Sequence, residues 1–261
     1  MSNALAGIPT IPPPWHLQGD CWWMVLKPLT TLPPAAYAPL EEPRGDDATN
    51  KTNTFLGGLG TVWIVRYHSS PAGPYDELIY APGNFVSPSG ESKPRITRIY
   101  VSTAVSNYNG RRNWNVPKHL ARFSFTPQDG NRTLVEVSDF YDDDAPFFAA
   151  IATPQRFVPA VPFSSNWLRY GKIPLPPLPT GPADHPEEVG TTDWVAFEQE
   201  TKGWVKPCWW EPGPFREGGK IPKGEYTDGV GFPKLDILSV GVQFQPGMTI
   251  DFSERFPVDG A

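Results

Sequence analysis

Residues 110–121 read Gly-Arg-Arg-Asn-Trp-Asn-Val-Pro-Lys-His-Leu-Ala. In this stretch Lys118 directly follows Pro117 and stands between apolar segments of an unusually aromatic chain. Proline restricts the backbone before the lysine, and a lysine held rigidly in a partly dry site gives up its proton readily. A neutral amine attacks carbonyl groups. The stretch therefore makes Lys118 the first candidate for a catalytic nucleophile.

The composition is that of a folded, aromatic protein. The chain has 261 residues, of which 19% are charged and 13% aromatic, with ten tryptophans. This composition excludes disorder, and we expect one domain over residues 1–261. The net charge of −6, without a basic cluster, argues against binding to nucleic acid.

Proline and glycine favour strands, turns and ordered loops over long helices, because the chain holds 33 prolines and 24 glycines. Turn residues separate short runs of β-branched and aromatic residues, which is typical of an antiparallel barrel or sandwich. The expected strands are Cys21–Lys27, Thr61–Tyr67, Glu77–Tyr80, Arg95–Ser102, Leu120–Phe125, Thr133–Val137, Phe147–Thr153, Trp167–Tyr170 and Leu235–Phe244.

Three other segments have distinct patterns. Thr192–Thr201 is the best helix candidate, and Leu29–Asn53 is expected to be a long loop. The proline tract within Lys172–Pro186 is interpreted as a stiff surface connector, with binding to a proline-recognising partner as the alternative.

Several kinds of site and signal are not expected. Met1–Pro14 lacks a secretory pattern, and no run is apolar enough to cross a membrane, so a cytoplasmic location without membrane association is expected. Cys21 and Cys208 form no metal-binding spacing. Asp139 and the acids at 142–144 match no calcium loop, so we expect no metal.

A family resemblance rests on an ordered series of motifs. These are Pro14–Gly19, Gly73–Leu78, Arg95–Val101, Gly110-Arg111 and Pro117-Lys118. The series resembles acetoacetate decarboxylase-like proteins over about half of the chain. The resemblance implies a divergent member, mainly β (α+β), with an antiparallel closed or cone-shaped β-barrel, long proline-rich loops and few short helices. It also implies a cofactor-independent enzyme that forms homo-oligomers.

The same resemblance implies roles for individual residues. Lys118 takes the place of the lysine that forms an imine with a ketone, and Glu77 that of a carboxylate that handles protons. The imine is an electron sink for the carbanion left when carbon dioxide is lost or a C–C bond is cleaved. Arg111 and Asn115 would order the lysine loop. In ordinary structural terms, Lys118 could instead be a surface lysine, Glu77 a turn residue and Arg111 an ion-pair former.

The sequence departs from the family pattern at positions that bear on the substrate. His119 replaces a second lysine, and on an extended strand it should face away from Lys118. Asp20 falls where a substrate-binding arginine is expected, Thr61 where a second glutamate is expected, and Arg112 follows Gly-Arg in place of an acid. A small β-keto acid anion would be repelled by Asp20, so acetoacetate is not the expected substrate.

A larger and less charged carbonyl compound of specialised metabolism fits these departures better. Aromatic side chains are expected to line its pocket: Trp22, Trp23, Trp63, Tyr75 and Trp114. The first hypothesis is a lyase of decarboxylase, aldolase or dehydratase type that uses a Lys118 Schiff base. The second is a pericyclase-like cyclase or isomerase that uses the same pocket without a covalent intermediate. The third is a small-molecule binder without turnover.

Overall fold

The computed structural model describes residues 7–45, 50–142, 145–168, 171–238 and 240–258. Within these residues strands dominate, and the α-helix is α2 (Ala104–Trp114). Short 3₁₀ turns span Lys51–Asn53, Asp129–Asn131 and Ser165–Leu168. The strands are β1 (Trp15–Val25), β2 (Phe55–Gly57), β3 (Thr61–Ser69), β4 (Tyr75–Ala81), β5 (Gly83–Val86), β6 (Ser92–Arg95), β7 (Arg98–Val101), β8 (Lys118–Gln128), β9 (Arg132–Asp139), β10 (Pro146–Pro154), β11 (Val161–Ser164), β12 (Ile173–Leu175), β13 (Val195–Phe197), β14 (Gln199–Pro212), β15 (Val240–Phe252) and β16 (Phe256–Pro257).

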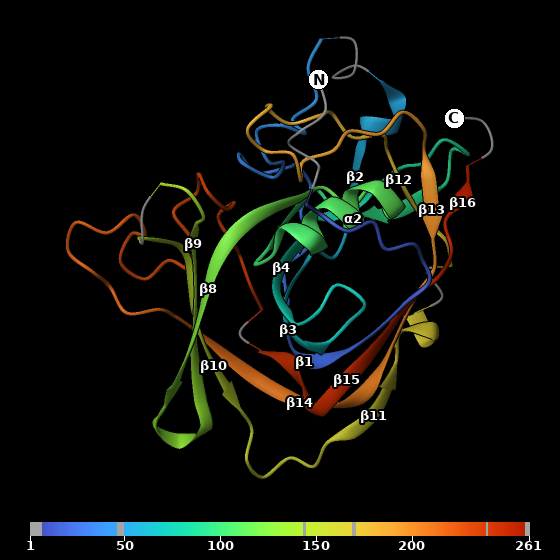
Figure 1. Cartoon of the computed structure of the whole chain (residues 1–261). Helices are drawn as coiled ribbons and strands as arrows, with labels where there is room; N and C mark the ends of the chain where they lie inside the picture. The colour runs from blue at the N-terminus through green and yellow to red at the C-terminus, as the bar shows by residue number, and fades with distance from the viewer. Residues whose placement is uncertain (1–6, 46–49, 143–144, 169–170, 239, 259–261) are drawn as a thin grey trace.

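Strands of the main sheet close into a barrel (Figure 1). The order is β10-β9-β8-β7-β4-β3-β1-β15-β14, and β14 pairs back onto β10. Strand β11 pairs with β14 outside this ring, and two small sheets are β2-β5-β6 and β12-β13-β16. The pairing is antiparallel except between β7 and β8, where α2 makes the crossover that a parallel pair requires. The expected mainly β fold with a closed barrel is confirmed, and the parallel pair is the exception to its antiparallel character.

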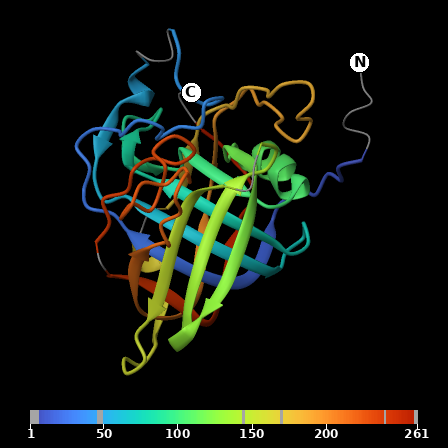
Figure 2. The ribbon, with the colours of Figure 1, turned by 90° about the vertical axis from the view of Figure 1, so that its left-hand side faces the viewer.

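Side-chain alternation divides the barrel residues between two hydrophobic cores. The first core fills the barrel lumen, because it takes residues from β9 and β10 as well as from the opposite strands. The second core lies on the outer face of β14, β15, β1, β3, β4, β7 and β8, where it packs against α2, β12 and β13 through Trp114, Leu175 and Phe197. We call this outer face the covered face. Figures 1 and 2 show α2 at one end of the barrel.

The sequence did not predict α2. The helix begins after Thr103, whose side chain accepts a hydrogen bond from the Ser106 amide, and ends at Asn115 in the left-handed conformation. Its buried residues are mostly small or polar: Ser106, Asn107, Asn109, Gly110, Arg111, Asn113 and Trp114. An apolar stripe with helical period is therefore missing, and that stripe is the main signal for a helix.

Several segments differ from their predicted structure, among them Leu235–Phe244, where β15 begins only at Val240. Thr192–Thr201 is not a helix, because β13 and the start of β14 occupy it. Its Val195-Ala196-Phe197 core is buried as an extended strand that pairs with β12, so tertiary pairing overrides the local pattern. Trp167 and Leu168 belong to a 3₁₀ turn rather than a strand, and residues 169–170 lie outside the described residues.

The proline tract is more than a surface connector. Ile173–Leu175 forms β12 and pairs with β13, and Leu175 and Leu178 are buried. Hydrogen bonds fasten the tract to α2, because Arg111 donates to the carbonyl of Pro179 at 2.7 Å. The segment is therefore part of the cover over the second core.

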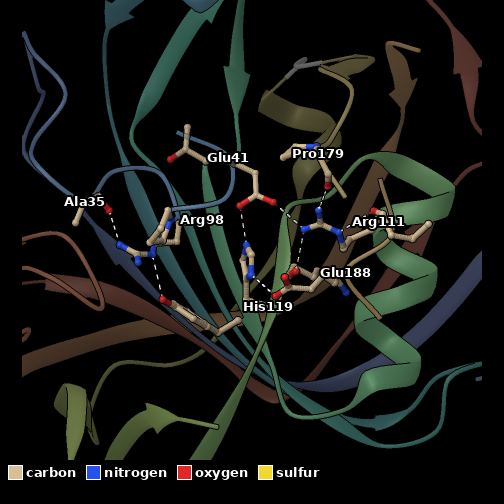
Figure 3. Close-up of polar contacts among 12 residues, drawn as sticks. Ala35, Glu41, Arg98, Arg111, His119, Pro179 and Glu188 are labelled. Carbon is tan, nitrogen blue, oxygen red and sulfur yellow. Dashed lines mark hydrogen bonds and ion pairs between the residues drawn. The ribbon is translucent and has the colours of Figure 1, made fainter. Parts of the chain in front are cut away.

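A buried network joins the loops around residues 41 and 188 to the barrel (Figure 3). His119 lies between two carboxylates, with Nδ1 2.6 Å from Glu188 Oε1 and Nε2 2.7 Å from Glu41 Oε2. Arg111 Nη1 also donates to Glu41 Oε1 at 2.8 Å. Burial lowers the pKa of His119, but the hydrogen bonds to Glu188 and Glu41 outweigh burial and raise the pKa overall. Burial raises the pKa of Glu41, yet contacts with His119 and Arg111 bring it below the ordinary value.

The network should make stability depend on pH. A group with a raised pKa in the folded state stabilises fully below its unfolded pKa, about 6.5 for histidine, and loses that contribution as pH rises through the folded pKa. We therefore expect the stability advantage of the wild type over His119→Gln to shrink as pH rises from 6 to 9, in urea unfolding experiments. The control is His68→Gln, at an exposed position. An advantage that does not change with pH would contradict a protonated His119.

Candidate active site

Lys118 lies buried at the start of β8, and only 6% of it is exposed. Its Nζ is 2.8 Å from Glu77 Oε1 and donates to Ser106 Oγ at 2.9 Å. The amine also lies 5.1 Å from the ring centroid of Tyr75, within cation–π range. The lysine predicted as the nucleophile and the glutamate predicted as its proton partner therefore form a buried pair.

Helix α2 shapes the space that the lysine occupies. Ser106 and Gly110 are four residues apart and share one face of the helix. A Cβ atom on Gly110 would lie 2.6 Å from Lys118 Cδ and 2.7 Å from Cε, closer than real contacts allow. Only glycine leaves room for the lysine side chain to pass along the helix to Glu77.

Neutral groups surround the carboxylate of Glu77. The Tyr67 hydroxyl donates to Glu77 Oε2 at 2.9 Å. Burial, followed by the charge of Glu77, raises the pKa of Tyr67, of Tyr75 and of the Cys21 thiol well above their ordinary values. These three groups stay protonated near neutral pH, so the charge of Glu77 is balanced locally by Lys118.

A cavity of ≈ 680 Å³ opens on the covered face. We call it the tryptophan cavity, because Trp23 and Trp63 line it with ring centroids 4.6 Å apart. Ile79, Ile96 and Ile173 add apolar wall, and Thr61 is among the polar lining residues. The chain thus places two of its predicted pocket tryptophans in one cavity.

The sheet register connects the amine to this cavity. Trp23, Trp63, Ile79, Ile99 and Lys118 are successive cross-strand partners on β1, β3, β4, β7 and β8. Glu77 lies two residues before Ile79 on β4 and therefore shares its face. The first three members of this row line the cavity, whereas Lys118 and Glu77 do not. Ile99 is the one residue of the row between the cavity wall and Lys118.

Four predicted pocket residues lie outside the tryptophan cavity, and one of them, Tyr75, lies beside Lys118 instead. Asp20 is the cross-strand partner of Arg66. It lies two residues before Trp22 on β1, so its side chain points to the lumen side of the sheet, the face opposite to Lys118. It is half-exposed there and lies 2.8 Å from His68. Trp22 is buried in the lumen core against Phe125, and Trp114 packs between Trp15 and Phe252 in the second core. Asp20, Trp22 and Trp114 are absent from the lining of the tryptophan cavity and from the linings of two other cavities, of ≈ 570 and ≈ 360 Å³.

Arg111 and Asn115 brace the lysine segment. Arg111 is fully buried and donates to the carbonyl oxygens of Val189 and of Lys118 itself. Asn115 donates to the carbonyl of Asp193 at 2.7 Å. His119 faces away from Lys118, as strand alternation predicts, but it is the centre of an ionic network rather than a packing residue.

Two further partners of the pair, Ser106 and Tyr67, carry no recognisable signal in the sequence. Ser106 is twelve residues from Lys118 on a helix that was not predicted, and Tyr67 meets Glu77 through strand pairing.

In the described part of the chain, no helix is long and apolar enough to span the bilayer. No group of three or more His, Cys, Asp or Glu side chains in that part is arranged to hold a metal ion.

Comparison with known proteins supports the fold. No family model matches the chain. A rice (Oryza sativa subsp. japonica) protein, Protein NEOXANTHIN-DEFICIENT 1, is 32% identical over 130 residues, which are 49% of this chain and 40% of the rice protein. The chain thus matches less than half of the length of that relative.

Several solved structures share the architecture. An acetoacetate decarboxylase superposes with a TM-score of 0.59 at 12% identity, over 99% of this chain and 94% of the other. Acetoacetate decarboxylase from Legionella pneumophila gives 0.51 at 14% identity, over 99% and 98% of the two chains. An acetoacetate decarboxylase-like enzyme from Sphingomonas wittichii gives 0.52 at 14% identity, over 95% and 94%. The chain therefore has the acetoacetate decarboxylase-like fold, in a divergent form.

Proposed function

We propose that this protein is a cofactor-independent enzyme that acts on a small, largely apolar carbonyl compound through an imine with Lys118. The observation that carries the proposal is the buried Lys118–Glu77 pair, 2.8 Å apart, on the same sheet face as the tryptophan cavity. A nucleophile with a proton acceptor in hydrogen-bond reach is the arrangement that covalent catalysis requires.

Glu77 supplies the proton transfers of imine formation. A proton passes from the Lys118 ammonium to the Glu77 carboxylate and frees the electron pair of the amine. The amine adds to the carbonyl carbon, Glu77 returns the proton to the oxygen, and water leaves to give a protonated imine. In decarboxylation, the bond between the α-carbon and the carboxylate carbon breaks, carbon dioxide leaves, and the electron pair of that bond passes into the iminium to give an enamine. A proton then adds to carbon, and water hydrolyses the imine to restore Lys118.

The substrate class follows from the cavity. Trp23, Trp63 and Ile79 give apolar walls, and ≈ 680 Å³ is large compared with acetoacetate. Decarboxylation, aldol chemistry in either direction and dehydration all use the same iminium. A place in specialised metabolism agrees with the name of the rice relative, which refers to neoxanthin. Homo-oligomer formation stays a prediction.

A second candidate function is a cyclase or isomerase without a covalent intermediate. It is favoured by one observation, that Lys118 and Glu77 lie outside the lining of the tryptophan cavity. In that case the cavity itself folds the substrate, and positioning and hydrogen bonding provide the catalysis. Turnover in Lys118→Met at the wild-type level would select this candidate.

Reductive trapping tests the imine. The purified protein is incubated with benzylideneacetone or acetophenone and sodium borohydride, and intact mass and peptide mapping locate the adduct. We expect one adduct on Lys118, its loss in Lys118→Met, and slower formation in Glu77→Gln because proton transfer is impaired. Lys27→Met is the control, because Lys27 is exposed and pairs with Asp236. Adducts confined to exposed lysines would contradict the proposed mechanism.

Gly110→Ala tests the position of the amine rather than its presence. The added methyl overlaps the flexible end of the Lys118 side chain, so the amine must move while the backbone is kept. Alanine also favours a helix over glycine by about 1 kcal/mol, so the fold should persist. We expect trapping to slow by about a hundred-fold, the usual scale for an ångström of displacement. Arg112→Ala, on the exposed side of α2, is the matched control, and trapping at the wild-type rate in Gly110→Ala would refute the geometry.

A further inference from the structure

A buried arginine lies at the boundary of the tryptophan cavity. Arg95, at the end of β6, is only 3% exposed, and its guanidinium lies between the rings of Phe85 and Trp194, 4.5 and 5.3 Å from their centroids. Nη1 donates to Asn53 Oδ1 at 3.0 Å, and Nη2 donates to the carbonyl oxygens of Thr52 at 2.7 Å and Val86 at 3.4 Å. Every one of these acceptors is neutral.

The positive charge of Arg95 lacks a counter-ion among the described residues. A buried cation is costly unless an anion is paired with it. Arg111, by comparison, is buried but lies 2.8 Å from a carboxylate oxygen of Glu41. Burial lowers the pKa of Arg95, and the group that acts in the opposite direction is the phenol of Tyr37 rather than a carboxylate. The phenol of Tyr37, which interacts with the guanidinium, is neutral near neutral pH, because burial raises its pKa.

A comparison with Arg98 shows that the distinguishing feature of Arg95 is its position at a cavity. Arg98 is also buried among neutral acceptors, which are the carbonyl oxygens of Ala35 and Val230 and the Tyr100 hydroxyl. Figure 3 shows Arg98 and Ala35. However, Arg98 is not among the residues that line the tryptophan cavity or the ≈ 570 Å³ cavity beside it, whereas Arg95 lines both. Arg95 is therefore a buried cation without a paired carboxylate among the described residues, and it borders a ligand-sized space.

The acids of the tryptophan cavity do not neutralise Arg95. The two glutamates of the lining belong to β14 and the residue before it. Glu198 is exposed, and Glu200 is engaged by Lys202 at 2.8 Å and by Asn166 at 2.6 Å. The apolar walls and the single buried cation therefore define the ligand that the cavity suits.

We propose that the tryptophan cavity binds an apolar molecule carrying an anionic group, a carboxylate or a group of similar charge, and that Arg95 binds that group. This inference names the substrate class of the proposed function and rests on that function in taking the cavity as the substrate site. It replaces the expectation of a less charged substrate, which depended on Asp20 facing the cavity. Arg95 and Ile99, the neighbour of Lys118, are four residues apart, so their Cα atoms are at most about 14 Å apart and one small molecule reaches both ends.

A matched pair of fluorescent probes tests the charge requirement. Anilinonaphthalene sulfonate carries an anionic group, and N-phenyl-1-naphthylamine has the same ring system without it. We expect the wild type to bind the sulfonate more tightly by about ten-fold or more, the scale of a hydrogen bond to a charged group. Arg95→Gln should lower affinity for the sulfonate by that factor and leave N-phenyl-1-naphthylamine binding unchanged. Equal affinity of the wild type for both probes would overturn the proposal.

Controls separate a binding role from a structural one and from the imine. Arg95→Lys keeps the charge and should keep part of the preference, even if Arg95→Gln fails to fold. Arg98→Gln should weaken neither probe selectively, and parallel loss of both probes in Arg95→Gln would mean that Arg95 only supports the fold. Competition by free acetate or sulfate as strong as by the sulfonate probe would place a small-anion site there instead and overturn the proposal. The preference should persist in Lys118→Met, so failure of the imine leaves this result intact.

Discussion

The candidate site depends on one buried ion pair, Lys118 with Glu77. Both side chains are almost fully buried, so each charge would be costly without the other. The remaining donors and acceptors of the pair are used by Ser106 and the Tyr67 hydroxyl. The arrangement requires glycine at position 110 of α2, because a larger residue there would push the lysine side chain away from the glutamate.

Because side chains alternate along a strand, the groups of the candidate site and those of the His119 network lie on opposite faces of the sheet. Lys118 faces the covered face and His119 the opposite one, so two adjacent residues serve two unrelated networks. The same rule removes Asp20 from the site, because it shares a face with Trp22 rather than with Cys21. In the cross-strand row from Trp23 to Lys118, Ile99 is the one residue that separates the cavity lining from the lysine.

Local sequence was sufficient for the barrel strands other than β14, and insufficient for the helix and for the strands of the two small sheets. Runs such as Thr61–Tyr67 combine β-branched and aromatic residues, and this signal survives in the structure as β3. Helix α2 carries polar and small residues on its buried face, since that face holds Lys118 and its partners rather than an apolar core. The helix could be recognised only once its function in the site was known.

Part of the site could be predicted from the sequence, and there are physical reasons why the rest could not. Lys118 and Glu77 were singled out by resemblance, and the parallel β7–β8 register and antiparallel β4–β7 register bring them together. Arg95 stood in a quoted motif, but nothing in a single arginine at a strand end indicates burial without a counter-ion. That property arises from the packing of Phe85 and Trp194 around it.

A double-mutant cycle on the free energy of unfolding tests the buried pair most directly. Lys118→Met and Glu77→Gln are made singly and together, and each protein is unfolded in urea. We expect each single change to cost about 3 kcal/mol or more, because it leaves one buried charge unpaired, and the double variant to cost clearly less than the sum. Costs that add to within about 0.5 kcal/mol would show that the two side chains do not interact, and the central claim would be wrong.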